Sequence, residues 1–385
     1  MLLAATKLQK RQTRRKTHKN VSDTSQYMST KTKNTQRTRS RLERRIGVGV
    51  FLLVILGVWL LSWKLFKNVD GASLAIGTQS KQTDEQKQGD SVVDPFAADR
   101  AYPVAVMLDN APEARPYHVG LSKAAVVYET LAEGGSTRLM LVFAGAPDAE
   151  RIGPIRSARP YFVETAAGWS SFYWHAGGSP EALEQIPGTD VVDLNEISGL
   201  GVLYFWRDNS IARPHNLFSD GKLIALGIDD FGLTEQPEEK LHWLRGVGNE
   251  EGDPAAEIYV DMSEGILFDS SFSYDAETHS YPRSMAGVAH VDQNTGEQLA
   301  PRSVIVQRVP AEGYYPSGYG RVKIKTIGEG DATFFANGVA QQIRWEKEDA
   351  DSQTRWLREG GELVSIPSGQ VWVVIVPGDR SVTYE

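Results

Sequence analysis

Three arginines stand within ten residues in RIGPIRSARP, which runs from Arg151 to Pro160 and contains no acidic residue. A guanidinium group binds phosphate or carboxylate oxygens in pairs, so this spacing suits an anion. Pro160 disfavours helical angles at the residue before it, which predicts a helix that begins at Pro160. Arg156 and Arg159 would then lie at the positive end of the helix dipole, where a cation is unfavourable unless an anion compensates it. The stretch therefore predicts a site for an oxyanion such as phosphate or pyrophosphate.

A second explanation of the same arginines stays open. Glu129, Glu133 or Glu164 could supply the negative charge as ordinary ion pairs inside the protein. Under this explanation the arginines stabilise the fold and bind no ligand. The sequence supports the two explanations equally.

Other polar segments are expected to converge on the same place. Arg138 follows a Gly-Gly turn and begins an apolar run, and His175 precedes a second Gly-Gly turn that leads into a helix, where backbone amides can hold an anion. The segment RPHN adds a guanidinium, an imidazole and an amide. The predicted ligand-binding residues are Arg138, Arg156, Arg159, His175, Arg213, His215 and Asn216.

Metal binding and catalysis are weaker possibilities. Asp109 ends a predicted strand, at the place where open α/β sheets bind ligands. With Glu129, His175 and His215 it could hold a divalent metal ion, although their spacing matches no metal-binding motif. Ser157 could act as a nucleophile beside a histidine, but the chain contains neither G-x-S-x-G nor a P-loop. The sequence leaves open whether the protein is an enzyme and whether it uses a metal cofactor.

The composition restricts the class of protein. The chain has 385 residues, 41% of them hydrophobic, with 9 Trp and 14 Tyr, as expected of a folded protein. It has no cysteine, which excludes disulfides, thiol catalysis, cysteine-based metal sites and a lipid attached to an N-terminal cysteine.

Charge divides the chain into two parts around an apolar segment. Residues 1–45 hold 14 Lys and Arg against two acidic residues, whereas residues 46–385 hold 27 Lys and Arg against 47 Asp and Glu. The intervening residues 46–63 carry no charge, and as a helix they would extend about 27 Å, close to the thickness of a bilayer core. A transmembrane helix is therefore predicted over 46–66, with the basic side in the cytoplasm. The alternative is a cleaved signal peptide, for which the preceding basic segment is too long.

The domain layout follows from these patterns. Residues 1–45 are predicted to be a disordered cytoplasmic tail that acts as a topology signal; anionic lipid could bind it, and nucleic acid is not an expected partner. Residues 67–98 are a polar linker. Residues 99–245 alternate strand and helix patterns, including strands over YPVAVMLDN and TRLMLVFAG and a helix over SKAAVVYETLAE. This alternation predicts an extracytoplasmic α/β domain.

Residues 246–385 differ in pattern. Short alternating runs are separated by Gly, Pro and Asn, and Asn337-Gly338 stands between two of them, which is a strong hairpin signal. A mostly antiparallel β-rich domain is expected here, which packs on the α/β domain or binds a protein partner. The predicted fold class is therefore an α/β domain followed by a mostly antiparallel β region, carried on a single N-terminal transmembrane helix.

The segments RIGPIRSARPYFVE, HAGGSPEAL, RPHNLF and GELVSIPSGQVWVVIVP resemble the YerB-like lipoprotein family, and the resemblance covers residues 99–385. It implies a bacterial protein anchored outside the cytoplasmic membrane. The activity of that family is unknown, so the resemblance implies location and architecture rather than a reaction. Because this chain has no cysteine to carry a lipid, the predicted transmembrane helix must anchor it instead.

A weaker resemblance concerns function. The order of strand, Gly-rich turn, PIR and GGSPEAL is similar to the LytR-CpsA-Psr family, which holds a polyprenyl pyrophosphate with arginines and magnesium and transfers envelope glycans. Asp109 and Arg156 fall where that family places an acid and an arginine, but its second acid is absent and Ser157 replaces an aspartate.

The leading hypothesis is a membrane protein that binds an anionic envelope component, such as a phosphate-bearing glycan or a lipid-linked pyrophosphate. The alternatives are a divalent-metal-dependent transferase or hydrolase of phosphate-linked envelope glycans, and an interaction scaffold without a small-molecule site.

Overall fold

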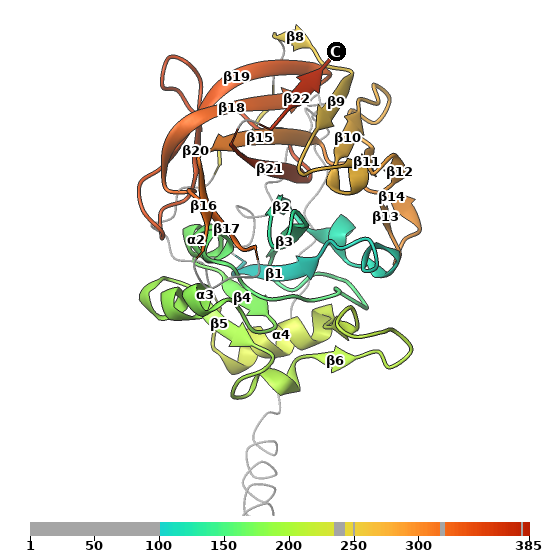
Figure 1. Ribbon diagram of the computed structural model, residues 1–385, viewed down its shortest axis with the longest axis vertical. Coiled ribbons are helices and arrows are strands. Elements are labelled where there is room, and N and C mark those ends of the chain that lie inside the picture. Colours follow the sequence, from blue (N-terminus) through green and yellow to red (C-terminus); the bar gives the residue numbers. More distant parts are fainter. Residues whose placement is uncertain (1–100, 235–242, 249–250, 316–319, 379) are drawn as a thin grey trace, which may run out of the picture. The chain divides into compact units, whose positions relative to one another are not determined.

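The computed structural model describes residues 101–234, 243–248, 251–315, 320–378 and 380–385 (Figure 1). They belong to a compact unit that runs from Lys87 to Glu385. The predicted tail, transmembrane segment and linker, over 1–45, 46–66 and 67–98, lie outside the described residues. Within the described part of the chain, no helix is long and apolar enough to cross a membrane.

The region predicted as α/β contains both strands and helices. Its strands are β1 (Pro103–Asp109), β2 (Val126–Leu131), β3 (Thr137–Ala144), β4 (Phe172–His175), β5 (Val192–Asn195), β6 (Trp206–Arg207) and β7 (Leu217–Phe218). Its α-helices are α2 (Pro160–Gly168), α3 (Pro180–Gln185) and α4 (Gly221–Asp230).

The rest of the described chain is almost entirely β. Its strands are β8 (Asp253–Pro254), β9 (Glu257–Val260), β10 (Ser270–Ser273), β11 (Arg283–Met285), β12 (Val288–Ala289), β13 (Val291–Asp292), β14 (Glu297–Gln298), β15 (Ser303–Val309), β16 (Ala311–Tyr314), β17 (Val322–Ile324), β18 (Gly328–Ala336), β19 (Val339–Lys347), β20 (Arg355–Leu357), β21 (Val371–Pro377) and β22 (Val382–Tyr384).

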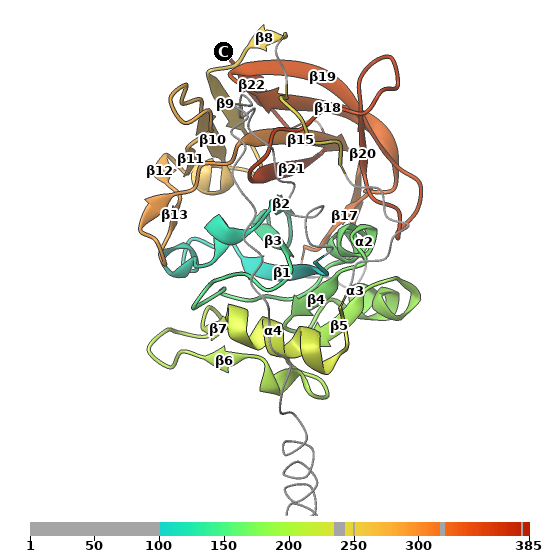
Figure 2. The same cartoon turned by 180° about the vertical axis from the view of Figure 1, so that it is seen from behind.

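One mixed sheet of 11 strands joins the two regions. Its order is β20-β19-β18-β15-β21-β2-β3-β1-β4-β5, with β8 paired to β19. The junction is the parallel pair of β21 and β2. Figures 1 and 2 show β15, β18, β19 and β21 above β1–β5 from both sides. The expected boundary near residue 245 therefore separates two sets of strands in the sequence, but those strands form a single sheet.

Smaller antiparallel sheets complete the β-rich region. A five-stranded sheet has the order β12-β11-β10-β9-β22, and the pairs β13-β14 and β16-β17 form two-stranded sheets. The fold is mostly β with few helices among the described residues, which agrees with the antiparallel part of the predicted fold class. The predicted α/β part is instead built around a mixed sheet, in which β1 pairs antiparallel with β3 and parallel with β4.

The predicted helix over SKAAVVYETLAE is wrong. Only Leu121–Lys123 forms a short 3-10 turn, and Val126–Leu131 is the central strand β2. Every residue of β2 is buried, between β3 on one side and β21 on the other. Val126, Val127 and Thr130 are β-branched and suit such a strand. Burial on both faces removes the alternation that would have indicated a strand in the sequence.

Other local predictions are confirmed. The run TRLMLVF forms β3 and is buried on both faces. α2 begins at Pro160, with Arg159 in extended conformation before it. The Ser179 side chain caps α3 by accepting a hydrogen bond from the Ala182 amide. Asn337 and Gly338 have φ angles of 55° and 78° and close the β18–β19 hairpin. These features depend on a few neighbouring residues and were therefore readable from the sequence.

Candidate functional site

Several predicted site residues meet where β1 ends. Asp109 is the last residue of β1 and lies opposite Arg138, near the start of the antiparallel strand β3. β4 runs parallel to β1, so its last residue, His175, lies at the same end of the sheet. The segment that carries Arg156 and Arg159 leads into α2 beside these strand ends; the Arg156 amide donates a hydrogen bond to the Met107 carbonyl of β1.

Asp109 is the centre of one ion-pair group. Its Oδ2 lies 3.0 Å from Arg156 Nε and 2.6 Å from His215 Nδ1, and its Oδ1 accepts a hydrogen bond from the Ala111 amide. Burial alone would raise the pKa of this carboxyl. The charges of Arg156 and Arg138 and the Ala111 amide outweigh burial, so the pKa of Asp109 lies below its ordinary value. Asp109 is therefore ionised and draws Arg156 and His215 together.

Glu133 is the centre of a second group. Its Oε2 lies 3.1 Å from the Arg138 guanidinium, and its other oxygen pairs with Arg159. Arg138 also donates to the Ser157 carbonyl at 2.8 Å. The carboxylates that pair with the arginines are thus Glu133, as the second explanation anticipated, and Asp109. We call Asp109, Glu133, Arg138, Arg156 and Arg159 the arginine cluster; its three guanidinium groups face two carboxylates.

A buried hydroxyl group beside the arginine cluster lacks a hydrogen-bond partner among the described residues. Tyr173, on β4, is fully buried, and within the described residues its hydroxyl has no hydrogen-bond partner. Burial raises the pKa of this phenol, while the charges of Arg138 and Arg159 act to lower it. Arg159 Nε is likewise buried without a hydrogen-bond partner in the described part of the chain. Unpaired buried polar atoms are rare in proteins, so these two atoms offer hydrogen bonds to a ligand or to water.

His175 and the turn after it are already occupied. His175 Nε2 lies 2.6 Å from Asp193 Oδ1 and its Nδ1 lies 2.7 Å from the Gly177 carbonyl. The Gly177 amide donates to Asn195 Oδ1, and the Ser179 amide donates to the Ala158 carbonyl. At the predicted second anion-binding site, the amides of Gly177 and Ser179 are therefore engaged in the fold, and α3, which follows the turn, is only six residues long.

The predicted site residues of the RPHN segment lie in different surroundings. His215 lies beside the arginine cluster, with its Nδ1 2.6 Å from Asp109 Oδ2. Asn216 is buried away from it, where its Oδ1 accepts from Arg207 and its Nδ2 donates to the Asp208 carbonyl. Arg213 is exposed. Of the predicted ligand-binding residues, the structure brings together Arg138, Arg156, Arg159 and His215.

The two carboxylates proposed for a metal do not fit one. Glu129 is fully buried, and its Oε2 lies 2.6 Å from the Arg283 guanidinium, while Asp109 pairs with Arg156. Guanidinium groups thus take the lone pairs that a divalent ion would need. Within the described residues, no group of three or more His, Cys, Asp or Glu could hold a metal ion. Ser157 donates its hydroxyl to the Ala176 carbonyl at 2.8 Å, which leaves no serine–histidine pair.

A buried chain of hydrogen bonds, which the sequence did not reveal, leads away from the cluster. His118 Nε2 lies 2.6 Å from the Asp109 carbonyl, which can only accept, so the proton is on Nε2. His118 Nδ1 must then accept from His290 Nε2 at 2.7 Å, and His290 Nδ1 accepts from Arg283 at 2.5 Å. Both imidazoles are neutral: burial lowers the pKa of His118 to about 4 and that of His290 well below its ordinary value.

Besides His118, three further residues of this part of the molecule were missed as functional candidates. Tyr173 had a usable signal, because in a strand it faces the same side as His175, two residues later. His290 and Arg283 had none, because they stand in separate short strands or turns and meet His118 and Glu129 only through the packing of two sheets.

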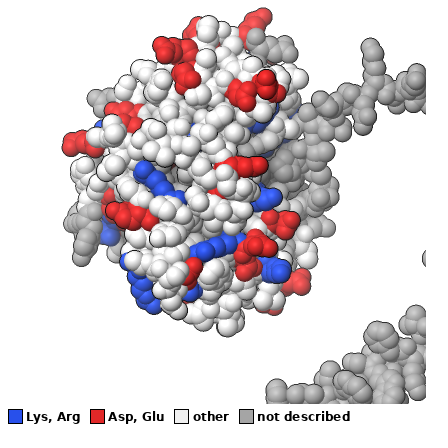
Figure 3. All heavy atoms as spheres, turned by 90° about the vertical axis from the view of Figure 1, so that its right-hand side faces the viewer, with Lys and Arg blue, Asp and Glu red and all other residues white. Residues whose placement is uncertain are grey.

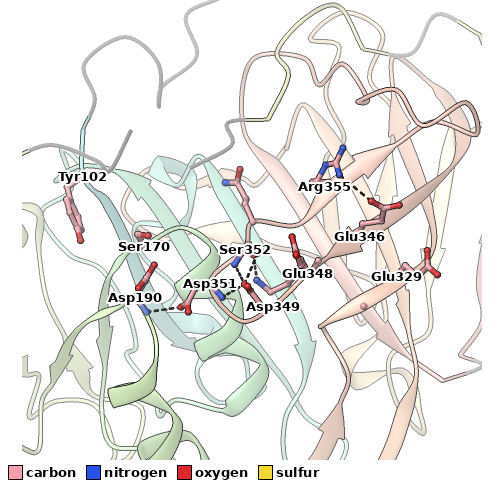
Figure 4. Close-up of a pocket in the computed structure, with 13 residues that line it drawn as sticks. Tyr102, Ser170, Asp190, Glu329, Glu346, Glu348, Asp349, Asp351, Ser352 and Arg355 are labelled. Carbon is pink, nitrogen blue, oxygen red and sulfur yellow. Dashed lines mark hydrogen bonds and ion pairs between the residues drawn. The ribbon is translucent and has the colours of Figure 1, made fainter. Parts of the chain in front are cut away.

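A separate hollow is acidic. It has a volume of about 940 Å³, and Figure 4 shows its carboxylates on facing segments. Its acidic lining residues are Asp190, Glu329, Glu346, Glu348, Asp349 and Asp351. Asp351 accepts from the Asp190 amide, and Glu346 pairs with Arg355. No predicted site residue lines this hollow, and its charge is wrong for an anion.

In Figure 3 most visible Lys and Arg lie in the lower half of the molecule, which holds β1–β7 in Figure 1.

Comparisons with known proteins match most of the chain. The N-terminal domain of "Protein of unknown function (DUF3048)" matches residues 91–234, and its C-terminal domain matches residues 258–373. "Putative lipoprotein YerB" of Bacillus subtilis (strain 168) is 30% identical over 276 residues, which cover 71% of this chain and 81% of that protein. The crystal structure of YerB protein from Bacillus subtilis matches with a TM-score of 0.64 and 28% identity, over 74% of this chain and 94% of that chain. The first matched range contains the whole arginine cluster.

Proposed function

The chain belongs to the DUF3048 family, and from this premise we infer that it is a membrane-anchored, extracytoplasmic envelope protein that binds an anionic component at its arginine cluster. The lipoprotein name of the Bacillus subtilis relative supports the location. Without a cysteine this chain carries no lipid on that residue, so residues 46–66 serve as the anchor and residues after about 66 lie outside.

A protease added to intact cells tests this topology. It should degrade the part of the chain after about residue 70 and leave the N-terminal segment intact, since the bilayer protects the cytoplasmic side. An epitope at the N-terminus and another at the C-terminus report the two sides separately. Loss of the N-terminal epitope before the C-terminal one would reverse the assignment.

The observation that supports anion binding is the imbalance of the cluster. Three guanidinium groups, one on β3 and two in the segment before α2, face two carboxylates, and Tyr173 and Arg159 keep polar atoms with no hydrogen-bond partner among the described residues. Glu133 stands just before a Gly-Gly turn and its side chain is 26% exposed, against 5% for Asp109. A phosphate can therefore replace Glu133 between Arg138 and Arg159, because it offers the same oxygens with more charge. The Glu133 carboxylate would then turn to solvent.

Thermal unfolding of the full chain in detergent tests the binding. Phosphate and pyrophosphate should raise the melting temperature, because a ligand that binds only the folded state stabilises it. The increase should weaken with added salt. Arg138→Ala should abolish it, because this arginine would hold the phosphate in place of Glu133, and Arg159→Lys should reduce it strongly because lysine lacks the planar fork. Arg355→Ala is the matched control: this arginine pairs with Glu346 at the acidic hollow, outside the cluster.

The opposite result has a clear meaning. A melting temperature that stays constant across millimolar phosphate and pyrophosphate, with Arg138→Ala losing stability in every buffer, would make the arginines internal ion-pair partners. The anion-binding proposal would then be abandoned, while the topology would be unaffected.

A further inference from the structure

The loop between β5 and β6 carries an uncharged apolar run on the surface. Residues 197–206 read ISGLGVLYFW. Within seven residues the loop exposes four aliphatic side chains: Ile197 is 67% exposed, Leu200 62%, Val202 63% and Leu203 61%. A soluble domain rarely exposes such a cluster without a partner, because each side chain would gain free energy on leaving water.

Part of the backbone of this loop is held by local hydrogen bonds. The Ser198 amide donates to the Asn195 carbonyl, the Gly201 amide to Ser198 and the Leu203 amide to Leu200, all at 3.0–3.1 Å. The loop is also tight, since a Cβ atom added to Gly201 would lie 2.0 Å from the Asn195 oxygen. These local hydrogen bonds reduce the cost of bringing the loop into a water-poor environment, because the amides that form them stay paired there.

The apolar run is bordered by an aromatic side chain and two arginines, Arg151 and Arg207, which pair with the carboxylates of Asp208 and Glu196. Trp206 ends the run and is 36% exposed, and the Arg151 guanidinium lies over its ring, 5.2 Å from the centroid. Arg207 follows directly. Leu226 on α4 and Phe231, which follows α4, are also exposed, and Figure 1 shows α4, β5 and β6 at the same end of the molecule. Aliphatic tips bordered by tryptophan and arginine match the order of side chains from the acyl region to the headgroups of a bilayer.

We propose that this loop, residues 197–206, contacts the outer surface of the lipid bilayer and inserts its aliphatic side chains at the headgroup level. The proposal rests on the membrane anchoring stated above. The predicted linker over 67–98 extends at most roughly 110 Å and as a coil averages about 30 Å. The tether thus holds the loop at a high effective concentration near the bilayer, so a weak contact is sufficient.

The composition favours a bilayer over a protein partner. Protein interfaces draw their binding energy mainly from Trp, Tyr and Arg, and Leu and Val are under-represented among the residues that matter most. The exposed tip here consists of Ile, Leu and Val. The loop also adjoins the turn after His175, since Ile197 Cδ1 would lie 3.1 Å from a Cβ atom at Gly177. A bilayer contact would therefore hold the sheet end with the arginine cluster close to the membrane surface.

The absence of cysteine allows a direct test. Leu200→Cys in the full chain, labelled with a polarity-sensitive fluorophore, is reconstituted into vesicles of phosphatidylcholine, with and without phosphatidylglycerol. Val288→Cys is the matched control, because Val288 is 69% exposed but belongs to β12 in the β-rich region. The label at position 200 should shift to shorter wavelength and lose at least half of its emission to quencher-bearing lipids. The label at position 288 should do neither.

Each other outcome overturns the proposal. If the chain floats with the vesicles but the label at 200 stays as unquenched as that at 288, the loop does not touch the bilayer and the anchoring stands. Equal quenching of both labels shows that the contact is not specific to this loop. If the chain does not float with vesicles, the anchoring and the loop contact both fail. Anion binding, measured by melting temperature, is independent of all three results.

Discussion

Glu129 and Arg283 stand 154 positions apart in the chain, yet the carboxylate and guanidinium groups lie 2.6 Å apart, and both side chains are fully buried. The pair links β2 of the large sheet to β11 of the five-stranded sheet. Trp372 Nε1 donates to Glu129 at 3.1 Å, and the Arg283 guanidinium lies 4.4 Å from the centroid of a Trp372 ring. A buried, hydrogen-bonded ion pair thus connects the two regions.

Breaking this pair should be costly. Arg283→Leu leaves the Glu129 carboxylate buried without its counter-ion, and the free energy of unfolding should fall by about 3–5 kcal/mol in urea titrations. The double variant Glu129→Leu/Arg283→Leu should recover part of this loss, because no charge remains buried. Arg344→Ala is the control: its pair with Glu329 is exposed and should contribute less than about 1 kcal/mol. A loss below about 1 kcal/mol for Arg283→Leu would contradict the buried pair.

Acid should destabilise the protein through His118. Its pKa is about 4 in the folded protein and about 6.5 in the unfolded chain, so between these values the unfolded chain binds more protons. The free energy of unfolding should therefore fall as the pH drops from 6.5 to 4, by about 3 kcal/mol for this group. His118→Gln should flatten the slope in this window, whereas the exposed His279→Gln should keep it. An unchanged slope in His118→Gln would show that another group titrates there.

Tyr173→Phe separates a ligand role from a structural one. Because the Tyr173 hydroxyl has no hydrogen-bond partner among the described residues, its removal should change the free energy of unfolding by less than about 1 kcal/mol. The rise in melting temperature with pyrophosphate should nevertheless become smaller. A large loss of stability would mean that the hydroxyl is bonded within the protein. An unchanged pyrophosphate response would exclude Tyr173 from the site.

Met140→Asp tests the central position of β3. Met140 is fully buried and lies opposite Met107 of β1 and Tyr128 of β2. The variant should lose several kcal/mol of stability, because it places an unpaired charge between two neighbouring strands. Met140→Leu keeps the volume and should cost less than about 1.5 kcal/mol. Similar melting temperatures for Met140→Asp and the parent would mean that β3 is not central.

Local features of the fold could be predicted from the sequence because their causes are local. Pro160 fixes the start of α2, Ser179 caps α3, and Asn337-Gly338 selects the hairpin turn through backbone angles that few residues adopt. The convergence of Asp109 with Arg138 and Arg156 was also predictable in outline, because strand ends at one side of a sheet meet.

What the arginines contact was decided only by the tertiary structure. The sequence offered several acids within reach, and packing selected Glu133 and Asp109 for the arginines, while Glu129 paired with Arg283 instead. The identity of β2 has the same origin: its parallel partner β21 lies about 245 residues later, so the residues that make VVYETL a strand are absent from its neighbourhood in the sequence. Backbone propensity acts between neighbours along the chain, whereas the partner of a buried strand or charge is set by what remains unpaired once the sheets have packed.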